Sequence, residues 1–260
     1  MLIKRKSIEQ AESSRRPTRK PKFAPVTLSE QDGVRYLHFG TEWVQGAMRI
    51  RKPDWPELEY AQQMMAWMLF IEQPQAIAQL GLGAATLTKF CYRQFPESTV
   101  TAVELNESVI NIAASMFKLP PADERLNVLE MDAMDFVLDP ANHGAFDVLQ
   151  SDLYDATARG PVLDTPEFYQ ACNACLADGG IMTVNLFGDH PSFAKNIKAM
   201  KFAFAHVICL PEVHEGNVVA LCFRDRPQLD QEALAARAAQ IVAVTKLPAK
   251  SWVKGILAAN

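Results

Sequence analysis

From residue 75 onward, short apolar stretches alternate with helical stretches, and this order constrains the fold more than any other feature of the chain. The predicted strands span residues 76–80, 99–104, 126–130, 146–151 and 181–186. Helices are predicted between them over residues 84–94, 108–117 and 166–177. Successive units of one strand and one helix specify a parallel sheet with helices on both faces and right-handed crossovers. The pattern therefore predicts an α/β, Rossmann-like fold.

The remaining segments complete this picture. Residues 202–210 and 218–223 read as an antiparallel pair that finishes a mostly parallel seven-stranded sheet. A helix is predicted over residues 57–70 and another over 230–244. Partial alternation and turn residues in 23–56 indicate a small cap of antiparallel strands. We therefore expect a β-cap over 23–56 and one catalytic domain over 57–260.

Residues 1–22 differ from the rest in charge. They hold eight Lys or Arg against two Glu, whereas the rest of the chain carries an acidic excess. Such a segment buries too little apolar surface to offset its ordering entropy, so we expect a disordered basic tail. It could serve as an arm that binds RNA phosphates, although a solubilising tail is the simpler interpretation.

The apolar stretches also bear on location and on metals. None approaches the roughly 20 residues that a membrane-spanning helix needs, and no signal-peptide pattern follows the first charges, so we expect a cytoplasmic protein. Cys172 and Cys175 form a C-x-x-C, but the second pair or histidine cluster of a zinc site is missing. We expect no metal.

Small residues follow the first strand of the alternation, at Gly81, Gly83 and Ala85. Small residues at a strand-to-helix turn let a ligand approach the backbone closely. Glu104 lies twenty-one residues beyond Gly83 at the end of the next strand, where a carboxylate can accept hydrogen bonds from ribose hydroxyls. Asp132 follows the third strand and is placed to accept a hydrogen bond from an adenine amino group. The three strand ends predict an adenosine site, although each acid could instead cap a helix.

After the fourth strand stand two carboxylates three residues apart, Asp152 and Asp155, followed by Gly160-Pro161 and Glu167-Phe168-Tyr169. Together with the Gly-rich turn, Glu104 and Asp132-Ala133, this order resembles the spermidine synthase family of aminopropyltransferases, over residues 25–225.

The resemblance implies roles for individual residues. Glu104 would hold the ribose, Asp132 and Ala133 the adenine, and Asp152 would act as the base at the reacting amine. Asp155 and Tyr60 would position the acceptor. The donor would be decarboxylated S-adenosylmethionine, the acceptor a small-molecule amine, and the assembly a homodimer.

Three departures from the family pattern leave the substrates open. Ala84 replaces an Asp that pairs with the donor's ammonium group, Arg49 aligns with an acceptor-site glutamine, and the loop 155–161 is longer and carries Arg159. A methyltransferase that uses S-adenosylmethionine is therefore one alternative. A non-catalytic protein that binds nucleoside or RNA is another.

Among the histidines, only His190 follows a strand end near the predicted site, beside Asp189. Either residue could touch substrate. Met131 and Phe187 are interpreted as core or as an apolar wall facing the adenine.

Overall fold

The computed structural model describes residues 23–155, 161–213 and 216–259. The predictions made for the basic tail 1–22 and for Arg159 lie outside these residues. Within the described ranges, no helix is both long enough and apolar enough to cross a bilayer.

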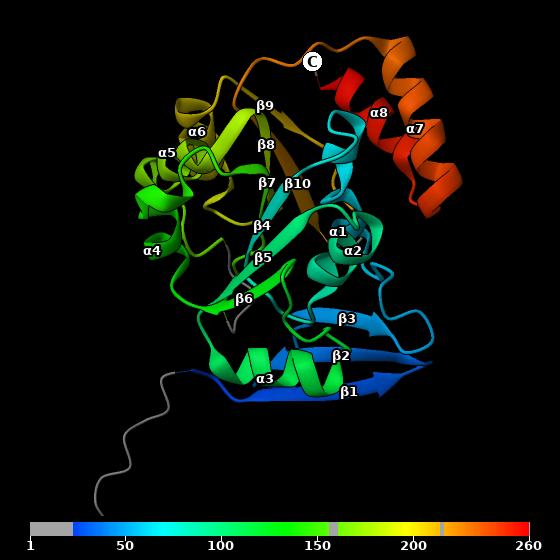
Figure 1. The fold of residues 1–260 in the computed structure, drawn as a ribbon, viewed down its shortest axis with the longest axis vertical. Coiled ribbons are helices and arrows are strands. Elements are labelled where there is room, and N and C mark those ends of the chain that lie inside the picture. Colours follow the sequence, from blue (N-terminus) through cyan, green and yellow to red (C-terminus); the bar gives the residue numbers. More distant parts are fainter. Residues whose placement is uncertain (1–22, 156–160, 214–215, 260) are drawn as a thin grey trace, which may run out of the picture.

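A small antiparallel sheet forms the N-terminal cap. It contains β1 (Val26–Gln31), β2 (Val34–Phe39) and β3 (Gly46–Arg49), in that spatial order. The cap is drawn in blue in Figure 1, where α3 (Glu107–Met116) lies alongside it. Apolar side chains of the cap pack against the end of this helix, around the fully buried Phe117. These contacts hold the cap over the carboxyl ends of the parallel strands.

The larger sheet has seven strands in the order β6-β5-β4-β7-β8-β10-β9. They are β4 (Ala76–Leu80), β5 (Thr99–Glu104), β6 (Leu126–Glu130), β7 (Phe146–Ser151), β8 (Leu176–Phe187), β9 (His206–Cys209) and β10 (Asn217–Phe223). Strands β4 to β8 pair with one another in parallel, whereas β10 runs antiparallel to both β8 and β9. The predicted fold class, a mostly parallel seven-stranded sheet with a β-cap, is confirmed.

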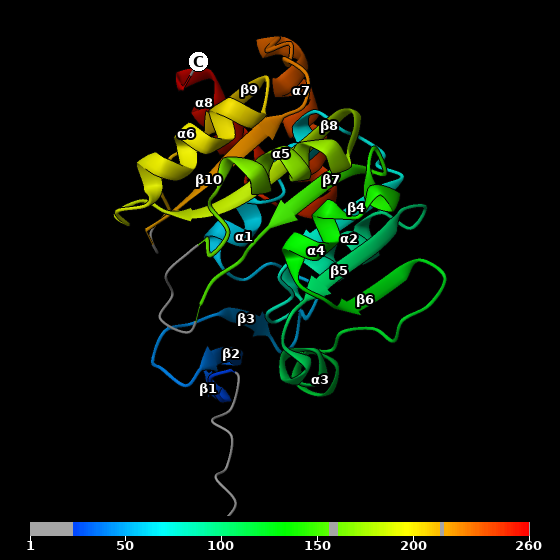
Figure 2. The ribbon, with the colours of Figure 1, turned by 90° about the vertical axis from the view of Figure 1, so that its left-hand side faces the viewer.

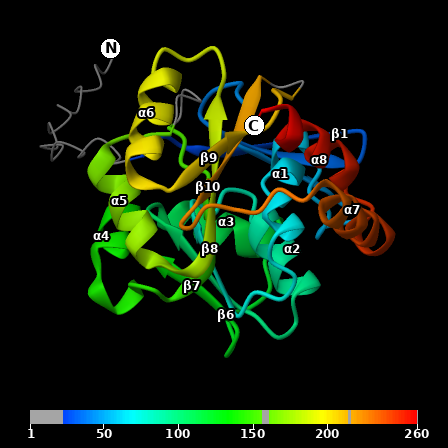
Figure 3. The same ribbon diagram turned by 90° about the horizontal axis from the view of Figure 1, so that it is seen from above.

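Helices cover both faces of this sheet. They are α1 (Glu59–Gln63), α2 (Thr86–Gln94), α4 (Ala133–Leu138), α5 (Pro166–Cys175), α6 (Phe193–Ala203), α7 (Gln231–Thr245) and α8 (Ala249–Ala258), with short 3-10 helices η1 (Ala66–Leu69) and η2 (Pro140–Asn142). Figures 2 and 3 show α4, α5 and α6 on one face and α1, α2, α7 and α8 on the other. The central strands are buried on both sides, which explains their continuous apolar runs.

The continuous helix predicted over residues 57–70 is wrong. The chain forms α1, turns at Met64, and resumes as η1. The freed carbonyl of Met64 accepts a hydrogen bond from the buried side chain of Gln150 on β7, 3.1 Å away. A partner far along the chain thus satisfies a backbone group that an uninterrupted helix would have used itself.

Other boundaries also shift. Helix α2 begins at Thr86 instead of residue 84, because Ala85 takes a left-handed conformation with φ 54°. Residues 202 and 203 belong to the end of α6, a helix that the sequence interpretation missed, so the predicted strand over 202–210 shortens to β9. The helix α8 was also missed.

Two cations hold the C-terminal end of α3. The fully buried Lys89 on α2 donates from Nζ to the Phe117 carbonyl oxygen at 2.6 Å, and Arg35 on β2 donates to the Met116 carbonyl. Positive groups are favourable at this end of a helix because they complement its dipole and its unpaired carbonyls. The contacts join the cap to the larger domain.

Burial lowers the pKa of Lys89 from its usual 10.5 to about 8. Between these two values the unfolded chain binds more protons than the folded chain, so stability should rise with pH across that interval. We expect Lys89→Met to remove this rise, which is on the order of 1–3 kcal/mol. Urea unfolding of both proteins from pH 7 to 10.5 measures it, and parallel stability curves would contradict it.

Candidate active site

A cavity of about 760 Å³ lies between the cap and the carboxyl ends of the parallel strands. Strand ends β4 to β8 supply one side of it, through residues such as Gly81, Glu104, Asp132, Asp152 and Asn185. The loop between β2 and β3 supplies the opposite side. This is the edge at which open α/β sheets bind their ligands.

The Gly-rich turn forms the floor of the cavity. Gly81 has φ +92°, and a Cβ on it would lie 2.3 Å from the carbonyl oxygen of Asp152. Gly83 also lines the cavity with positive φ. Ala85, predicted to contact the cofactor, is instead fully buried and does not line the cavity. Glycine at 81 is therefore required for β4 and the end of β7 to lie this close.

Glu104 and Asp132 both face the cavity, as predicted. Glu104 accepts hydrogen bonds from the backbone amides of Leu82 at 3.1 Å and Asn106 at 2.9 Å. Burial raises the pKa of Glu104, while these amides oppose the shift. Asp132 caps α4 by accepting from the Met134 amide at 2.8 Å, so it has a structural role while lining the cavity together with Ala133.

Asp152 stands where several elements meet. Its Oδ2 accepts a hydrogen bond from the Tyr60 hydroxyl on α1 at 3.2 Å, and its Oδ1 accepts from the Asn185 side chain on β8 at 2.8 Å. Burial raises the pKa of Asp152, and the two donors partly offset the effect. The structure thus brings the predicted pair Asp152 and Tyr60 into direct contact and adds Asn185.

Asp155 lines the outer part of the cavity and is exposed. Its backbone carbonyl accepts a hydrogen bond from the Gln45 side chain at 3.1 Å. Gln45 also lines the cavity, so it is the glutamine that reaches the site from the cap, four positions before Arg49. Arg49, which the sequence analysis aligned with an acceptor-site glutamine, does not line the cavity.

The two substitutions that cast doubt on the substrate lie away from the cavity. Arg49 forms a two-pronged ion pair with Glu57, with Nε at 2.9 Å from Oε2. This pair raises the pKa of Arg49 and turns its charge away from the site. Ala84 is buried beneath the cap against Gly46, where an added Cβ would lie 2.8 Å from the Ala84 methyl group. Neither residue lines the cavity.

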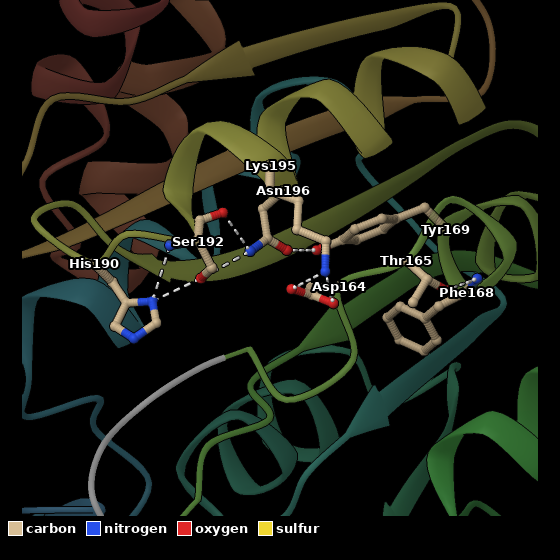
Figure 4. A network of polar contacts seen from close by, with 8 residues as sticks. All are labelled: Asp164, Thr165, Phe168, Tyr169, His190, Ser192, Lys195 and Asn196. Atoms are coloured by element: carbon tan, nitrogen blue, oxygen red, sulfur yellow. Dashed lines mark hydrogen bonds and ion pairs between the residues drawn. The ribbon is translucent and has the colours of Figure 1, made fainter.

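His190 does not line the cavity in the part of the chain that the structure describes. Figure 4 shows its ring turned toward Ser192, whose hydroxyl lies 2.7 Å from Nδ1. Asp189, its predicted alternative, is exposed and likewise lies outside the lining. Met131 and Phe187 do line the cavity, as the interpretation of an apolar wall expected.

The charged groups among the described lining residues share one sign. Five carboxylates line it, and no Lys, Arg or His is found among its described lining residues. The carboxylates belong to Glu42, Glu104, Asp132, Asp152 and Asp155. A cavity of this kind concentrates cations and disfavours anions, because its low-dielectric walls strengthen the field of the acids.

Comparisons with known proteins agree with this geometry. The family model described as "Spermine/spermidine synthase domain" matches residues 81–230, more than half of the chain. The polyamine aminopropyltransferase of Chromobacterium violaceum is 31% identical over 218 residues, which cover 83% of each protein.

Solved structures share the fold. A probable spermidine synthase from Corynebacterium glutamicum superimposes with a TM-score of 0.70 at 19% identity, covering 89% of this chain and 91% of that one. Human methyltransferase-like protein 13, solved with SAH, gives 0.63 at 23% identity, covering 74% and 94%. The fold alone therefore fits two kinds of transferase. The sequence also matches the human eEF1A lysine and N-terminal methyltransferase, but at 28% identity over only 45% of this chain and 18% of that protein. The chain belongs to the spermine/spermidine synthase family of transferases.

Proposed function

We propose that this protein transfers an aminopropyl group from decarboxylated S-adenosylmethionine to a small-molecule amine. The amine nitrogen attacks the propyl carbon bound to the sulfonium, the carbon–sulfur bond breaks, and methylthioadenosine leaves. The attacking nitrogen loses one proton, which Asp152 accepts. Both partners are substrates that the reaction consumes.

The charge of the cavity carries this proposal. The decarboxylated donor has a sulfonium and an ammonium group, and the acceptor is an amine that is cationic in water. Five carboxylates among the described lining residues, with no basic side chain beside them, suit such ligands. The carboxylate of S-adenosylmethionine would find no cationic partner among these described lining residues, so the same observation disfavours methyl transfer.

The donor's adenosine fits the strand ends. Gly81 and Gly83 let it approach the backbone, and Glu104 would accept hydrogen bonds from the ribose hydroxyls. Asp132 has one carboxylate oxygen bonded to the Met134 amide, which leaves the other for the adenine amino group. Ala133 would border the adenine. Ala85 does not line the cavity, so no contact with the donor is proposed for it.

Asp152 is suited to act as the general base. A sulfonium is an activated electrophile, so the protein must chiefly present an unprotonated amine in line with the transferred carbon. Tyr60 and Asn185 fix the carboxylate from two sides, and proton acceptance by a positioned base contributes a factor of about 10² to 10⁴. Asp155 and Gln45, at the outer part of the cavity, would help to position the acceptor.

Calorimetric titration with the two forms of the donor tests this assignment. We expect decarboxylated S-adenosylmethionine to bind at least about tenfold more tightly than S-adenosylmethionine, since tenfold corresponds to only about 1.4 kcal/mol. Methylthioadenosine, which lacks both the ammonium and the carboxylate, serves as the control for the shared moiety. Preference for the carboxylated donor would favour methyl transfer, and failure of all three to bind would contradict the adenosine site.

A further inference from the structure

Two buried asparagines form a chain of hydrogen bonds that ends at Asp152. Asn217, the first residue of β10, donates from Nδ2 to Oδ1 of Asn185 on β8 at 2.9 Å. Asn185 in turn donates from Nδ2 to Oδ1 of Asp152 at 2.8 Å. Asn185 is 2% exposed and Asn217 is 8% exposed, and both border the cavity.

The direction of this chain follows from chemistry. An ionised carboxylate only accepts hydrogen bonds, whereas a carboxamide has a donor end and an acceptor end. Asn185 must therefore turn its NH₂ group to Asp152, which leaves its oxygen facing Asn217. The Asn217 amide supplies the donor that this oxygen needs. If Asn185 rotated by half a turn, two pairs of like partial charges would face each other.

The antiparallel register brings the two asparagines together. Asn185 is opposite Val219, and Asn217 is opposite Phe187, so the two side chains are diagonal neighbours on adjacent strands. No ionisable side chain on β8 or β10 borders the cavity. Two ionisable side chains interact with Asp152: Tyr60 on α1 donates a hydrogen bond to it, and Tyr154 on the following loop interacts with it electrostatically.

The remaining ionisable groups of the lining lie on other elements. They are Glu42, Glu104, Asp132 and Asp155, on the cap loop and at the ends of β5, β6 and β7. All are acids, so none of them offsets the cost of an ionised Asp152. The donors Asn185 and Tyr60 are thus the neighbouring groups that favour its ionised form against burial.

We propose that Asn217 is a positioning residue: it fixes the orientation of the Asn185 amide and thereby holds the Asp152 carboxylate as an aimed hydrogen-bond acceptor. Asn217 acts through Asn185 and touches no reacting atom. Its effect on catalysis rests on the proposed function, whereas its effect on the protonation of Asp152 does not.

The variant Asn217→Leu keeps the size of the side chain and removes the donor. Asn185 is then free to turn its oxygen toward Asp152, so the pKa of Asp152 should rise. We expect the acid limb of the kcat profile to move to higher pH and kcat to fall by about 10- to 100-fold at neutral pH. Donor affinity should stay within about twofold. Asn185→Leu should give the same changes, and the double variant should be no worse than Asn185→Leu.

Asn196 provides a matched control. It is a fully buried asparagine on α6 that accepts a hydrogen bond from Tyr169 at 2.6 Å and donates to Ser192 (Figure 4). It does not line the cavity. Asn196→Leu should lower stability without moving the acid limb. A merely structural role for Asn217 would give the same pattern as Asn196.

Carbon-13 NMR titration of Asp152 separates the two levels of the proposal. A raised pKa of Asp152 in Asn217→Leu supports the positioning role, whether or not the wild-type protein transfers an aminopropyl group. Absence of transfer by the wild-type protein would contradict the proposed function alone. An unchanged Asp152 titration in a folded Asn217→Leu variant overturns the positioning role. So does an effect of the two asparagine variants on kcat that is fully additive.

Discussion

Replacing Asp152 by asparagine is expected to reduce aminopropyl transfer by about 10² to 10⁴ while leaving donor binding within a few fold. The substitution preserves the shape of the side chain but removes the proton acceptor. Donor binding should survive because the adenosine contacts come from other strand ends, at Glu104 and Asp132. Single-turnover kinetics and calorimetry with the decarboxylated donor measure the two quantities separately.

The stability of this variant provides an internal check. Burial raises the pKa of Asp152 above its unfolded value, so the stability it contributes is full below the unfolded pKa and is lost as pH rises through the folded pKa. Asp152→Asn should therefore unfold at the same temperature as the wild type, or higher, at neutral pH. The exposed Asp139, which caps η2, offers a control as Asp139→Asn with unchanged turnover. Wild-type rates in Asp152→Asn would exclude Asp152 as the base.

Gly81→Ala is expected to cost the most stability of any single methyl addition near the site. The new Cβ would meet the Asp152 carbonyl at 2.3 Å, a backbone atom that cannot move without shifting β7. Backbone strain at this left-handed position costs about 1–2 kcal/mol. Together with the clash, it should lower the free energy of unfolding by more than about 3 kcal/mol. Donor affinity should fall with it, because Asp152 and the cavity floor move together. Urea unfolding and donor titration provide the measurements.

Gly144→Ala is the matched control for that strain. Gly144 also has positive φ, at +66°, but an added Cβ there has no atom within 4 Å. In Gly144→Ala, backbone strain alone should lower the free energy of unfolding, by about 1–2 kcal/mol, and donor binding should not change. Equal losses in the two variants would show that the close approach of Gly81 to Asp152 contributes nothing.

Much of the fold and half of the site follow from local sequence patterns. Gly81, Glu104, Asp132 and Asp152 each lie at or just after the end of a predicted strand. Parallel strands end at one edge, so the convergence of these residues could be predicted without coordinates. The sheet order could be expected for the same reason, since strand–helix units of this length allow few topologies.

The residues that were missed depend on contacts distant in sequence. Asn185 and Asn217 meet only because β8 and β10 pair in one particular register. A carboxamide in a mostly apolar strand was the available signal for Asn185, but that signal does not identify its partner. Gln45 reaches the cavity because of how the cap packs on α3. The break after α1 depends on Gln150, 86 positions beyond Met64.

Arg49 shows that the position of a charged residue in the sequence does not predict where its side chain points. Its sequence position suggested a cation in the acceptor site, yet its partner Glu57 turns it outward. The net charge of the cavity is thus decided by side-chain direction, which a sequence pattern does not specify.

One measurement tests the central claim most directly: mass spectrometry of products after incubating the purified protein with decarboxylated S-adenosylmethionine and a panel of small primary amines. We predict methylthioadenosine in equal amount to an amine that has gained one aminopropyl group. The same panel with S-adenosylmethionine should give no product. Methylated product with S-adenosylmethionine, and none with the decarboxylated donor, would contradict the account.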